Sequence, residues 1–256
     1  MDRNKSAYKL KDFGPLYIIN LDGQPERWKW MKDQLDYWQV TNYERISAFD
    51  GRDDDLSEII SGRYPNAVSS GEIGCVTSHL KSIKHWYDTT DTEYGIFMED
   101  DCDFCTVKHW PFSWRECMAR MPYDWDCLQV AIINPRRLVA NVHPRYVDDF
   151  STACFVINRR YAEKLMHFHC RGEKFKLDNG VRPRAVADDL IYNAGKTYAI
   201  PLFLYKLELG STIHPEHIDA FHKTSREGLD HWWTNQSADM PIDKFFEYDT
   251  HELYQK

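Results

Sequence analysis

Residues 94–104 read YGIFMEDDCDF, an apolar run that ends in three adjacent carboxylates, Glu99, Asp100 and Asp101. The aromatic and β-branched residues of this run predict a buried strand of a mostly parallel sheet. In open α/β sheets, ligands bind just beyond the carboxyl ends of such strands. Carboxylates crowded at that point repel one another, and a divalent cation is the simplest compensation. The stretch therefore predicts a metal-assisted site for a phosphorylated ligand.

The composition predicts one soluble α/β domain over residues 1–256. Hydrophobic residues make up 43% of the chain and charged residues 28%, as in ordinary globular proteins. The formal net charge of -8 provides no positive field to attract nucleic acid. No apolar run approaches the ~18 to 20 residues of a membrane span, and residues 1–14 lack the apolar core of a signal peptide. We therefore expect a cytoplasmic protein with no transmembrane segment and no nucleic-acid partner.

The cysteines and aromatic residues say little about the functional class of the protein. The 7 cysteines are an odd number in a long chain, which does not predict a disulfide framework. Cys102 and Cys105 form a single CxxC pair, and we interpret them as incidental thiols beside the acidic cluster. The aromatic content of 14% suits stacking on sugars, but a dense core is the simpler interpretation.

The first strand and helix place two polar residues where phosphates usually bind. Residues 16–21 predict the strand, and Pro25 stands at a plausible first helical position. Apolar residues at 28, 31, 35 and 38 then predict a helix. Asn20 and Arg27 lie at or just beyond the carboxyl end of the strand. For Arg27, a surface charge at the start of a helix is the simpler interpretation.

A second strand–helix unit follows. Residues 43–49 predict a strand that ends at Asp50, where a carboxylate could bind a ribose hydroxyl. Residues 69–74 open a helix whose apolar positions 76, 80, 83 and 86 share one face. Small residues at its start would let backbone amides approach an anion. His79 could be a core histidine.

The second half of the chain predicts further strands at 128–133, 152–157 and 197–204, the last at a sheet edge because of Pro201. Helices are predicted at 158–166, from an Asn cap, and at 187–192. Residues 106–127 should be helical or irregular, 134–150 a surface connection and 169–185 a loop, and the tail from 218 has no clear strand. Asp188 and Asp189 start the short helix, either as partners of the helix dipole or as a general base.

Several stretches together resemble glycosyltransferase family 25, whose members modify lipopolysaccharide and collagen. The resemblance covers about residues 15–215. The matching stretches are NLDGQPER (20–27), ISAFDG (46–51), GEIGCVTSHLKSIKHW (71–86), YGIFMEDDCDF (94–104), STACFVINRRYAEKLM (151–166) and VADDLIYNAG (186–195). The resemblance implies a GT-A fold, a Rossmann-like α/β sandwich with a mostly parallel central sheet. It also implies transfer of a hexose, galactose or glucose, from a UDP-sugar to a glycan or glycolipid hydroxyl, with Mn²⁺ or Mg²⁺ and with inversion to a β-linkage.

The resemblance also implies roles for individual residues. Asp101 would be the main metal ligand, and Glu99 would contact the metal or the ribose. His214 would be a further metal ligand, with His217 as the second choice. The acceptor hydroxyl would be deprotonated by Asp188 or Asp189, with Asp188 preferred. Nucleotide-sugar contacts would come from Asn20, Arg27, Asp50, His79, Lys81, Glu99 and Asp100.

Some features depart from the family or leave other functions open. Asp22 stands where the family commonly has basic residues, and Asp100 and Asp103 could be structural. Residues 216–256 have no match and would form an acceptor-side or packing extension, and a glycolipid acceptor would allow peripheral membrane contact. A metal-dependent hydrolase of nucleotide-sugars or phosphodiesters could use the same carboxylates. A non-catalytic sugar-binding module would be expected to lack them.

Overall fold

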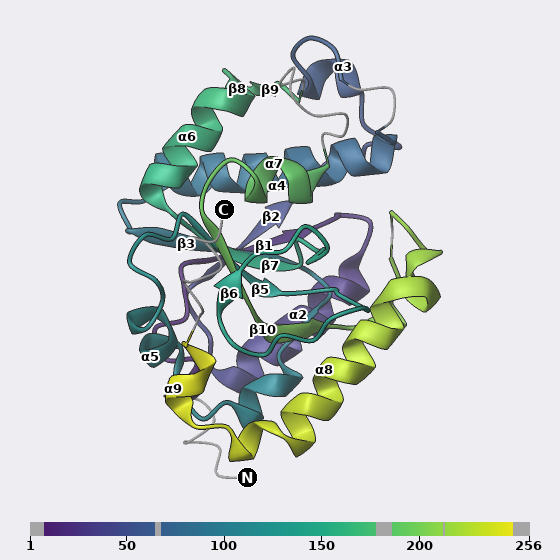
Figure 1. Cartoon of the computed structure of the whole chain (residues 1–256). Coiled ribbons are helices and arrows are strands. Elements are labelled where there is room, and N and C mark those ends of the chain that lie inside the picture. The colour runs from purple at the N-terminus through teal and green to yellow at the C-terminus, as the bar shows by residue number, and fades with distance from the viewer. Residues whose placement is uncertain (1–7, 65–67, 178–185, 212, 248–256) are drawn as a thin grey trace, which may run out of the picture.

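The computed structural model describes residues 8–64, 68–177, 186–211 and 213–247, and a central sheet carries helices on both faces (Figure 1). The strands are β1 (Leu16–Asn20), β2 (Tyr43–Ser47), β3 (Tyr94–Glu99), β4 (Cys102–Asp103), β5 (Cys127–Ala131), β6 (His143–Pro144), β7 (Cys154–Asn158), β8 (Cys170–Arg171), β9 (Lys174–Phe175) and β10 (Thr197–Tyr205). The α-helices are α2 (Pro25–Trp38), α3 (Leu56–Ile59), α4 (Ser70–Thr89), α5 (Trp114–Ala119), α6 (Arg159–His169), α7 (Ala187–Tyr192), α8 (Lys223–Asn235) and α9 (Ile242–Phe245). Shorter helical turns are η1 (Cys105–His109), η2 (Leu207–Leu209), η3 (Ile218–His222) and η4 (Ser237–Asp239).

The main sheet has 8 strands in the order β2-β1-β3-β7-β5-β10-β4, with β6 paired to β10. β1 is parallel to β2 and β3, and β10 is parallel to β5. β7 runs antiparallel to both of its neighbours, β3 and β5. β2, β1, β3, β5 and β10 thus point the same way, which confirms the predicted α/β fold with a mostly parallel central sheet.

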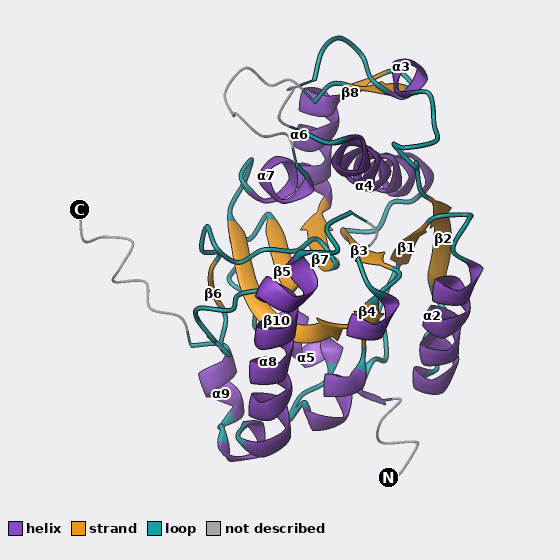
Figure 2. Cartoon of the chain, turned by 90° about the vertical axis from the view of Figure 1, so that its right-hand side faces the viewer, coloured by secondary structure: helices purple, strands orange, loops and turns teal. Residues whose placement is uncertain are grey.

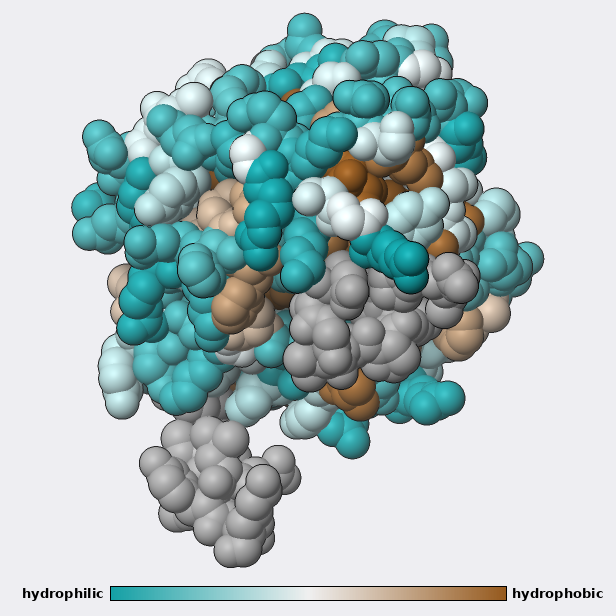
Figure 3. Space-filling view, turned by 90° about the horizontal axis from the view of Figure 1, so that it is seen from above, coloured by the Kyte–Doolittle hydropathy of each residue, from teal (hydrophilic) through white to brown (hydrophobic). Residues whose placement is uncertain are grey.

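The two faces of the sheet bury separate hydrophobic cores. Successive residues of β3 alternate between them: Ile96 and Met98 join the core with α2, whereas Phe97 joins the core with α4. Figure 2 shows α4, α6 and α7 on one side of the sheet and α2, α5 and α8 on the other. Because both faces are covered, the strands read as continuous apolar runs in the sequence. Seen from above, the outer face over α4 and α6 is mainly hydrophilic, with smaller hydrophobic areas (Figure 3).

The predicted apolar face of α4 is confirmed, since Val76, Leu80, Ile83 and Trp86 are all fully buried. A capping box begins this helix: the Ser69 side chain accepts from the backbone N–H of Glu72, and the Glu72 carboxylate accepts from the backbone N–H of Ser69.

Two glycines allow the start of α4 to pack closely against the turn after β2. A Cβ on Gly74 would lie 2.6 Å from the backbone nitrogen of Gly51, and one on Gly51 would lie 1.8 Å from the carbonyl oxygen of Ser70. This close approach brings the turn that carries Asp50 against the first turns of α4.

The prediction that 197–204 forms an edge strand is wrong. β10 has β5 on one side and the short strands β6 and β4 on the other. Pro201 lies between the residues that pair with β6 and those that pair with β4, at the shift in register with β5. A residue without a backbone N–H is therefore tolerated inside the sheet.

Other local predictions also need correction. Residues 169–185 were expected to be a loop, but 170–175 form the β8–β9 hairpin, and 178–185 lie outside the described residues. The tail from 218 has no strand in its described part, as predicted; it forms α8 and α9, and Trp233 and Phe245 from it are fully buried against the sheet. Within the described residues, no helix combines the length and apolar character needed to cross a bilayer.

Candidate active site

Two cavities open along the carboxyl ends of the parallel strands. The first, which we call the Asp101 cavity, measures about 100 Å³ and is lined by residues including Asp50, Glu99, Asp100 and Asp101. The second, which we call the Asp188 cavity, measures about 520 Å³ and is lined by residues including Asp188, Asp189, Arg145 and His214. The cavities share four lining residues: Cys75, Glu99, Ser211 and Ile213. They therefore meet beside Glu99.

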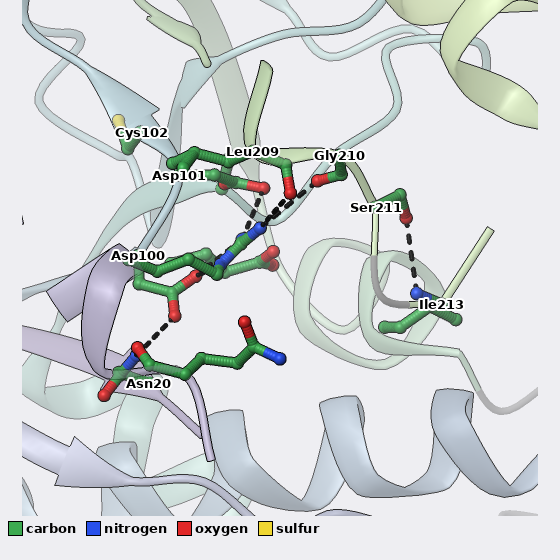
Figure 4. Close-up of polar contacts among 12 residues, drawn as sticks. Asn20, Asp100, Asp101, Cys102, Leu209, Gly210, Ser211 and Ile213 are labelled. Atoms are coloured by element: carbon green, nitrogen blue, oxygen red, sulfur yellow. Dashed lines mark hydrogen bonds and ion pairs between the residues drawn. The ribbon is translucent and has the colours of Figure 1, made fainter. Parts of the chain in front are cut away.

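Arg27 holds the acidic residues after β3 in place. Its Nε donates to Asp100 Oδ1 at 2.7 Å, its Nη2 forms an ion pair with the same oxygen at 2.6 Å, and Nη2 donates to Asp101 Oδ2 at 3.0 Å. Its Nη1 donates to the carbonyl oxygens of Leu209 and Gly210 at 3.1 and 3.2 Å. Figure 4 shows these two carboxylates and two carbonyl groups converging on one point.

These contacts make Arg27 a buried clamp rather than a surface charge. All three guanidinium nitrogens donate to protein groups, and only 6% of the residue is exposed. Burial disfavours the charged guanidinium, but the charge of Asp101 and the hydrogen bonds and charge of Asp100 raise the pKa of Arg27. A phosphate contact by Arg27 stays a prediction, and it would require exchange of one of these partners.

Asn20 completes the support of Asp100. Its Nδ2 donates to Asp100 Oδ2 at 2.6 Å and to the carbonyl oxygen of Gln24 at 3.1 Å, while its Oδ1 accepts from Arg45 Nε at 2.7 Å. Figure 4 shows Asn20 directly below Asp100. The side chains of Asn20 and Asp100 thus bind to other protein groups, as a structural role for Asp100 would require.

Asp101 differs from Asp100 because one of its carboxylate oxygens has no hydrogen-bond partner among the described residues. Its Oδ2 accepts from Arg27, but its buried Oδ1 has no partner within the described part of the chain. Burial raises the pKa of Asp101 to about 7; Arg27 opposes this, whereas Glu99 and Asp100 add to it. The surroundings therefore do not fully compensate the charged form of this carboxylate.

Glu99 lies at the junction of the cavities and is held from both sides. Its Oε1 is 3.0 Å from His79 Nε2 and accepts from the Thr152 hydroxyl at 2.8 Å. Burial would raise the pKa of Glu99, but the hydrogen bonds from His79 and Thr152 and the charge of His79 outweigh it and lower the pKa. His79 is 1% exposed, as a core histidine would be, yet it also reaches the site.

Asp188 enters the larger cavity from the start of α7. Its Oδ1 accepts from the backbone N–H of Ser151 at 2.7 Å. Ser151 has a positive φ of 95°, which few residues other than glycine adopt, and this backbone carries the N–H that meets Asp188. Burial raises the pKa of Asp188; Arg145 and the Ser151 N–H oppose this, and Glu99 and Asp189 add to it.

Asp189 lines the same cavity as Asp188 but has a different hydrogen-bond partner. Its Oδ1 accepts from Asn193 Nδ2 at 3.2 Å, one turn later on α7. The sequence-based preference for Asp188 over Asp189 as the base stays a prediction.

Arg145 borders Asp188 and is held by its own contacts. Its guanidinium lies 4.6 Å from the centre of the Tyr192 ring, its Nε donates to Gln129 Oε1 at 3.0 Å, and its Nη2 is 4.0 Å from Asp188 Oδ1. Gln129 is fully buried, and its Nε2 also donates to the carbonyl oxygens of Phe150 and Ser151 at 2.8 and 3.0 Å.

The histidines after β10 lie in the Asp188 cavity. His214 Nε2 is 3.2 Å from Glu72 Oε1 and its Nδ1 is 3.2 Å from Glu216 Oε1. Its ring stacks on His217 with 4.5 Å between the ring centres. Glu72 therefore links His214 to the capped start of α4.

Two further predicted residues have protein partners of their own. Asp50 lines the Asp101 cavity and accepts from Arg52 Nε and Nη2 at 2.7 and 2.6 Å. Lys81 donates to the carbonyl oxygen of Ser47 at 2.8 Å and lies over the ring of Phe49. Their roles in nucleotide binding stay predictions.

The described residues contain two groups of at least three potential ligands whose ligand atoms all lie within 4.8 Å of one another. One is Cys75, His79 and Glu99, and the other is His214, Glu216 and His217. The predicted set of Asp101, Glu99 and His214 is not one of them and stays a prediction. The unpartnered oxygen of Asp101, beside two more carboxylates, fits a hard divalent cation.

Sequence reasoning missed four residues that shape the site: Cys75, Arg145, Ser151 and Thr152. Ser151 and Thr152 stand inside the stretch STACFVIN, directly before β7, and this position at a strand end was the available signal. Arg145 lies in a segment predicted to be a surface connection, and its partner Gln129 is 16 residues away.

Comparison with known proteins finds a family similarity in the first part of the chain. Residues 13–109 match the family model of glycosyltransferase family 25 (LPS biosynthesis protein). A search among curated proteins found no match. The matched region runs from the residues before β1 to the end of η1 and contains Asn20, Arg27, Asp50, His79 and the three carboxylates after β3. Residues 13–109 of the chain are thus similar to glycosyltransferase family 25, and this similarity supports a glycosyltransferase.

Proposed function

We propose that the protein transfers a hexose, galactose or glucose, from a UDP-sugar to a hydroxyl group of a glycan or glycolipid, with inversion at the sugar carbon. The donor would occupy the Asp101 cavity and the acceptor the Asp188 cavity. The observation that carries this proposal is that the two cavities meet at Glu99, with a separate carboxylate site on each side. An inverting displacement needs such a division, because the base must act on the face opposite the leaving group.

The chemistry of Asp188 supports its role as the base. A general base works best when its pKa lies closer to the operating pH than that of an ordinary carboxylate, and burial raises the pKa of Asp188. The Ser151 N–H fixes one carboxylate oxygen. The other oxygen could then accept the proton of the acceptor hydroxyl as that oxygen attacks the sugar carbon.

Asp101, with Glu99 beside it, is the proposed holder of a divalent cation, Mn²⁺ or Mg²⁺. When bound, such a cation neutralises charge that develops on a departing diphosphate. Arg27, itself held by Asp100, would set the position of the Asp101 carboxylate.

Substitution of Asp101 tests the donor half of the proposal. In Asp101→Asn the side-chain oxygen can still accept from Arg27, so we expect the fold to persist. We expect Mn²⁺-dependent binding of UDP, measured by calorimetry, to be lost. Asp189→Asn, which changes a carboxylate in the other cavity, is the matched control and should bind UDP as the wild type does. UDP binding by Asp101→Asn at wild-type affinity would contradict the donor assignment.

The products formed from the donor separate transfer from hydrolysis. We expect sugar from UDP-galactose or UDP-glucose to appear on a glycan acceptor. Release of only free sugar, in the presence of a panel of glycan acceptors, would favour a nucleotide-sugar hydrolase instead.

A further inference from the structure

A thiol, an imidazole and a carboxylate converge where the two cavities meet. Cys75 and His79 are four residues apart on α4, which places them on the same helical face. Glu99 reaches them from the end of β3, and its Oε1 is 3.0 Å from His79 Nε2. The ligand atoms of all three lie within 4.8 Å of one another.

We propose that Cys75, His79 and Glu99 form a second metal site, distinct from Asp101, that takes Zn²⁺ or a metal of similar softness. Zinc accepts cysteine sulfur, histidine nitrogen and glutamate oxygen together, with ligand distances of about 2.0 to 2.3 Å. Mn²⁺ and Mg²⁺ favour oxygen ligands and would not select the thiolate. The cysteine and histidine ligands therefore separate this site from the cation site proposed at Asp101, with which it shares Glu99.

The site is accessible and incompletely coordinated. Cys75 and Glu99 both line both cavities, so an ion can reach the ligands from the cleft. Three protein ligands leave a fourth tetrahedral position for water or a ligand. Binding requires the thiolate and the free Nε2 lone pair, so the thiol proton is released to solvent and the imidazole proton shifts to Nδ1.

The surroundings of His79 predict an exchangeable site rather than a permanently filled one. Its Nδ1 is buried with no hydrogen-bond partner within the described residues. Metal-bound histidines normally donate this second N–H to a carboxylate or carbonyl, which strengthens the bond to the metal. Without that partner, the metal should bind when added and leave when chelated.

Occupancy would affect catalysis if the proposed function holds, because Glu99 would bind zinc and would no longer be available to the cation proposed at Asp101. We then expect added Zn²⁺ to inhibit transfer by the Mn²⁺-loaded enzyme. The metal site itself does not depend on the proposed function, and its test uses no activity.

Cobalt spectroscopy on the full-length chain tests the site directly. Co²⁺ bound to a thiolate gives a near-ultraviolet charge-transfer band, and we expect this band to appear with one equivalent of Co²⁺ and to vanish when Zn²⁺ is added. Cys75→Ser should abolish the band. Cys105→Ser and Cys170→Ser, which change other partly exposed thiols, should retain it. Asp101→Asn should also retain it, which separates this site from the proposed donor site.

Alkylation of the unmodified chain provides a second test that needs no variant. At a free Zn²⁺ concentration about ten times Kd, about a tenth of the sites are empty, so labelling of Cys75 should slow about tenfold. Labelling of Cys170, read from peptide masses, should not change. Absence of Co²⁺ binding, a band that persists in Cys75→Ser, or unchanged labelling of Cys75 would each overturn the proposal.

Discussion

At the scale of single residues, Arg27 shows how one side chain can organise a site. It joins Asp100 and Asp101, which follow β3, to the backbone of residues 209 and 210, which follow β10. Two carboxylates and a guanidinium are buried together here. Removal of one partner from such a group leaves charge that is neither hydrated nor paired.

We therefore predict that Arg27→Leu lowers the free energy of unfolding by about 3 to 5 kcal/mol, because Asp100 loses its cation. The matched control is Arg120→Leu, which removes an ion pair with Asp243 in which 43% and 89% of the two side chains are exposed. Exposed pairs contribute about 0 to 1 kcal/mol. Chemical denaturation of both variants measures the difference, and equal small losses would show that Arg27 is not a structural clamp.

Gly74 supports a second prediction at this scale. An alanine there favours the helix by about 1 kcal/mol but would place its Cβ 2.7 Å from the carbonyl oxygen of Phe49. Backbone cannot yield as a flexible side chain can, so we predict that Gly74→Ala destabilises the protein by about 1 to 3 kcal/mol.

Gly228→Ala in α8 is the control for Gly74→Ala, because its Cβ would meet only the Leu138 side chain at 3.7 Å. It should leave stability unchanged or raise it, since both variants gain the same helix propensity. Thermal melting of the two variants separates the effects. A stabilised Gly74→Ala protein would contradict the close packing of α4 on the turn after β2.

At the scale of elements, the segment from β6 to β7 positions the groups on the acceptor side. Asp149 accepts from Asn134 Nδ2 and from the Tyr146 backbone N–H, both at 2.8 Å, and His143 Nε2 lies 3.3 Å from it. Gln129 then holds the carbonyl groups of residues 149–151. These contacts hold the backbone of Ser151, whose N–H donates to Asp188.

The pH dependence of stability tests this support. Burial would raise the pKa of Asp149, but hydrogen bonds from His143, Asn134 and the Tyr146 N–H outweigh it and lower the pKa below its ordinary value of 3.8. A carboxylate whose pKa is lower in the folded state stabilises the fold above the unfolded pKa, and that contribution is lost as the pH falls through the folded pKa.

We therefore predict that Asp149→Asn destabilises the protein by about 1 to 3 kcal/mol at pH 7, because its amide would face donors. The difference from the wild type should shrink as the pH falls below about 4, where Asp149 itself becomes protonated. Urea unfolding of both proteins between pH 3 and 7 (about the carboxylate titration range) measures this. A difference that stays constant across the range would show that the charge of Asp149 does not contribute.

Most elements could be predicted because their signals are local. The apolar runs of β1, β3, β5 and β7 and the spacing of apolar residues in α2 and α4 are visible within a few positions. The position of β10 could not be predicted, because its neighbours β4 and β6 pair with it across long separations. The strands of the β8–β9 hairpin have two residues each, too few to show an alternation of apolar and polar residues in the sequence.

At the scale of the whole molecule, the candidate site could be predicted in part. The sequence placed Glu99 and Asp101 at a strand end and Asp188 at a helix start, and both positions face the shared cleft. The role of Arg27 as a clamp depends on Asp100, 73 residues away, and on the turn after β10. Contacts of that range leave no trace in local spacing, which is why a surface charge was the simpler interpretation of Arg27.

The central claim is that donor binding and deprotonation of the acceptor are carried by separate carboxylates on the two sides of Glu99. Asp188→Asn tests it most directly, because its side-chain oxygen can still accept from the Ser151 N–H and the fold should persist. We predict that its Mn²⁺-dependent affinity for UDP equals that of the wild type and that transfer falls by about 10² to 10⁴. Asp189→Asn should retain transfer.

The measurement pairs UDP calorimetry with single-turnover transfer from whichever of UDP-galactose and UDP-glucose raises the melting temperature more. Wild-type affinity together with loss of transfer in Asp188→Asn alone is the predicted result. Transfer at the wild-type rate by Asp188→Asn, or loss of UDP binding in the same variant, would contradict the division of roles.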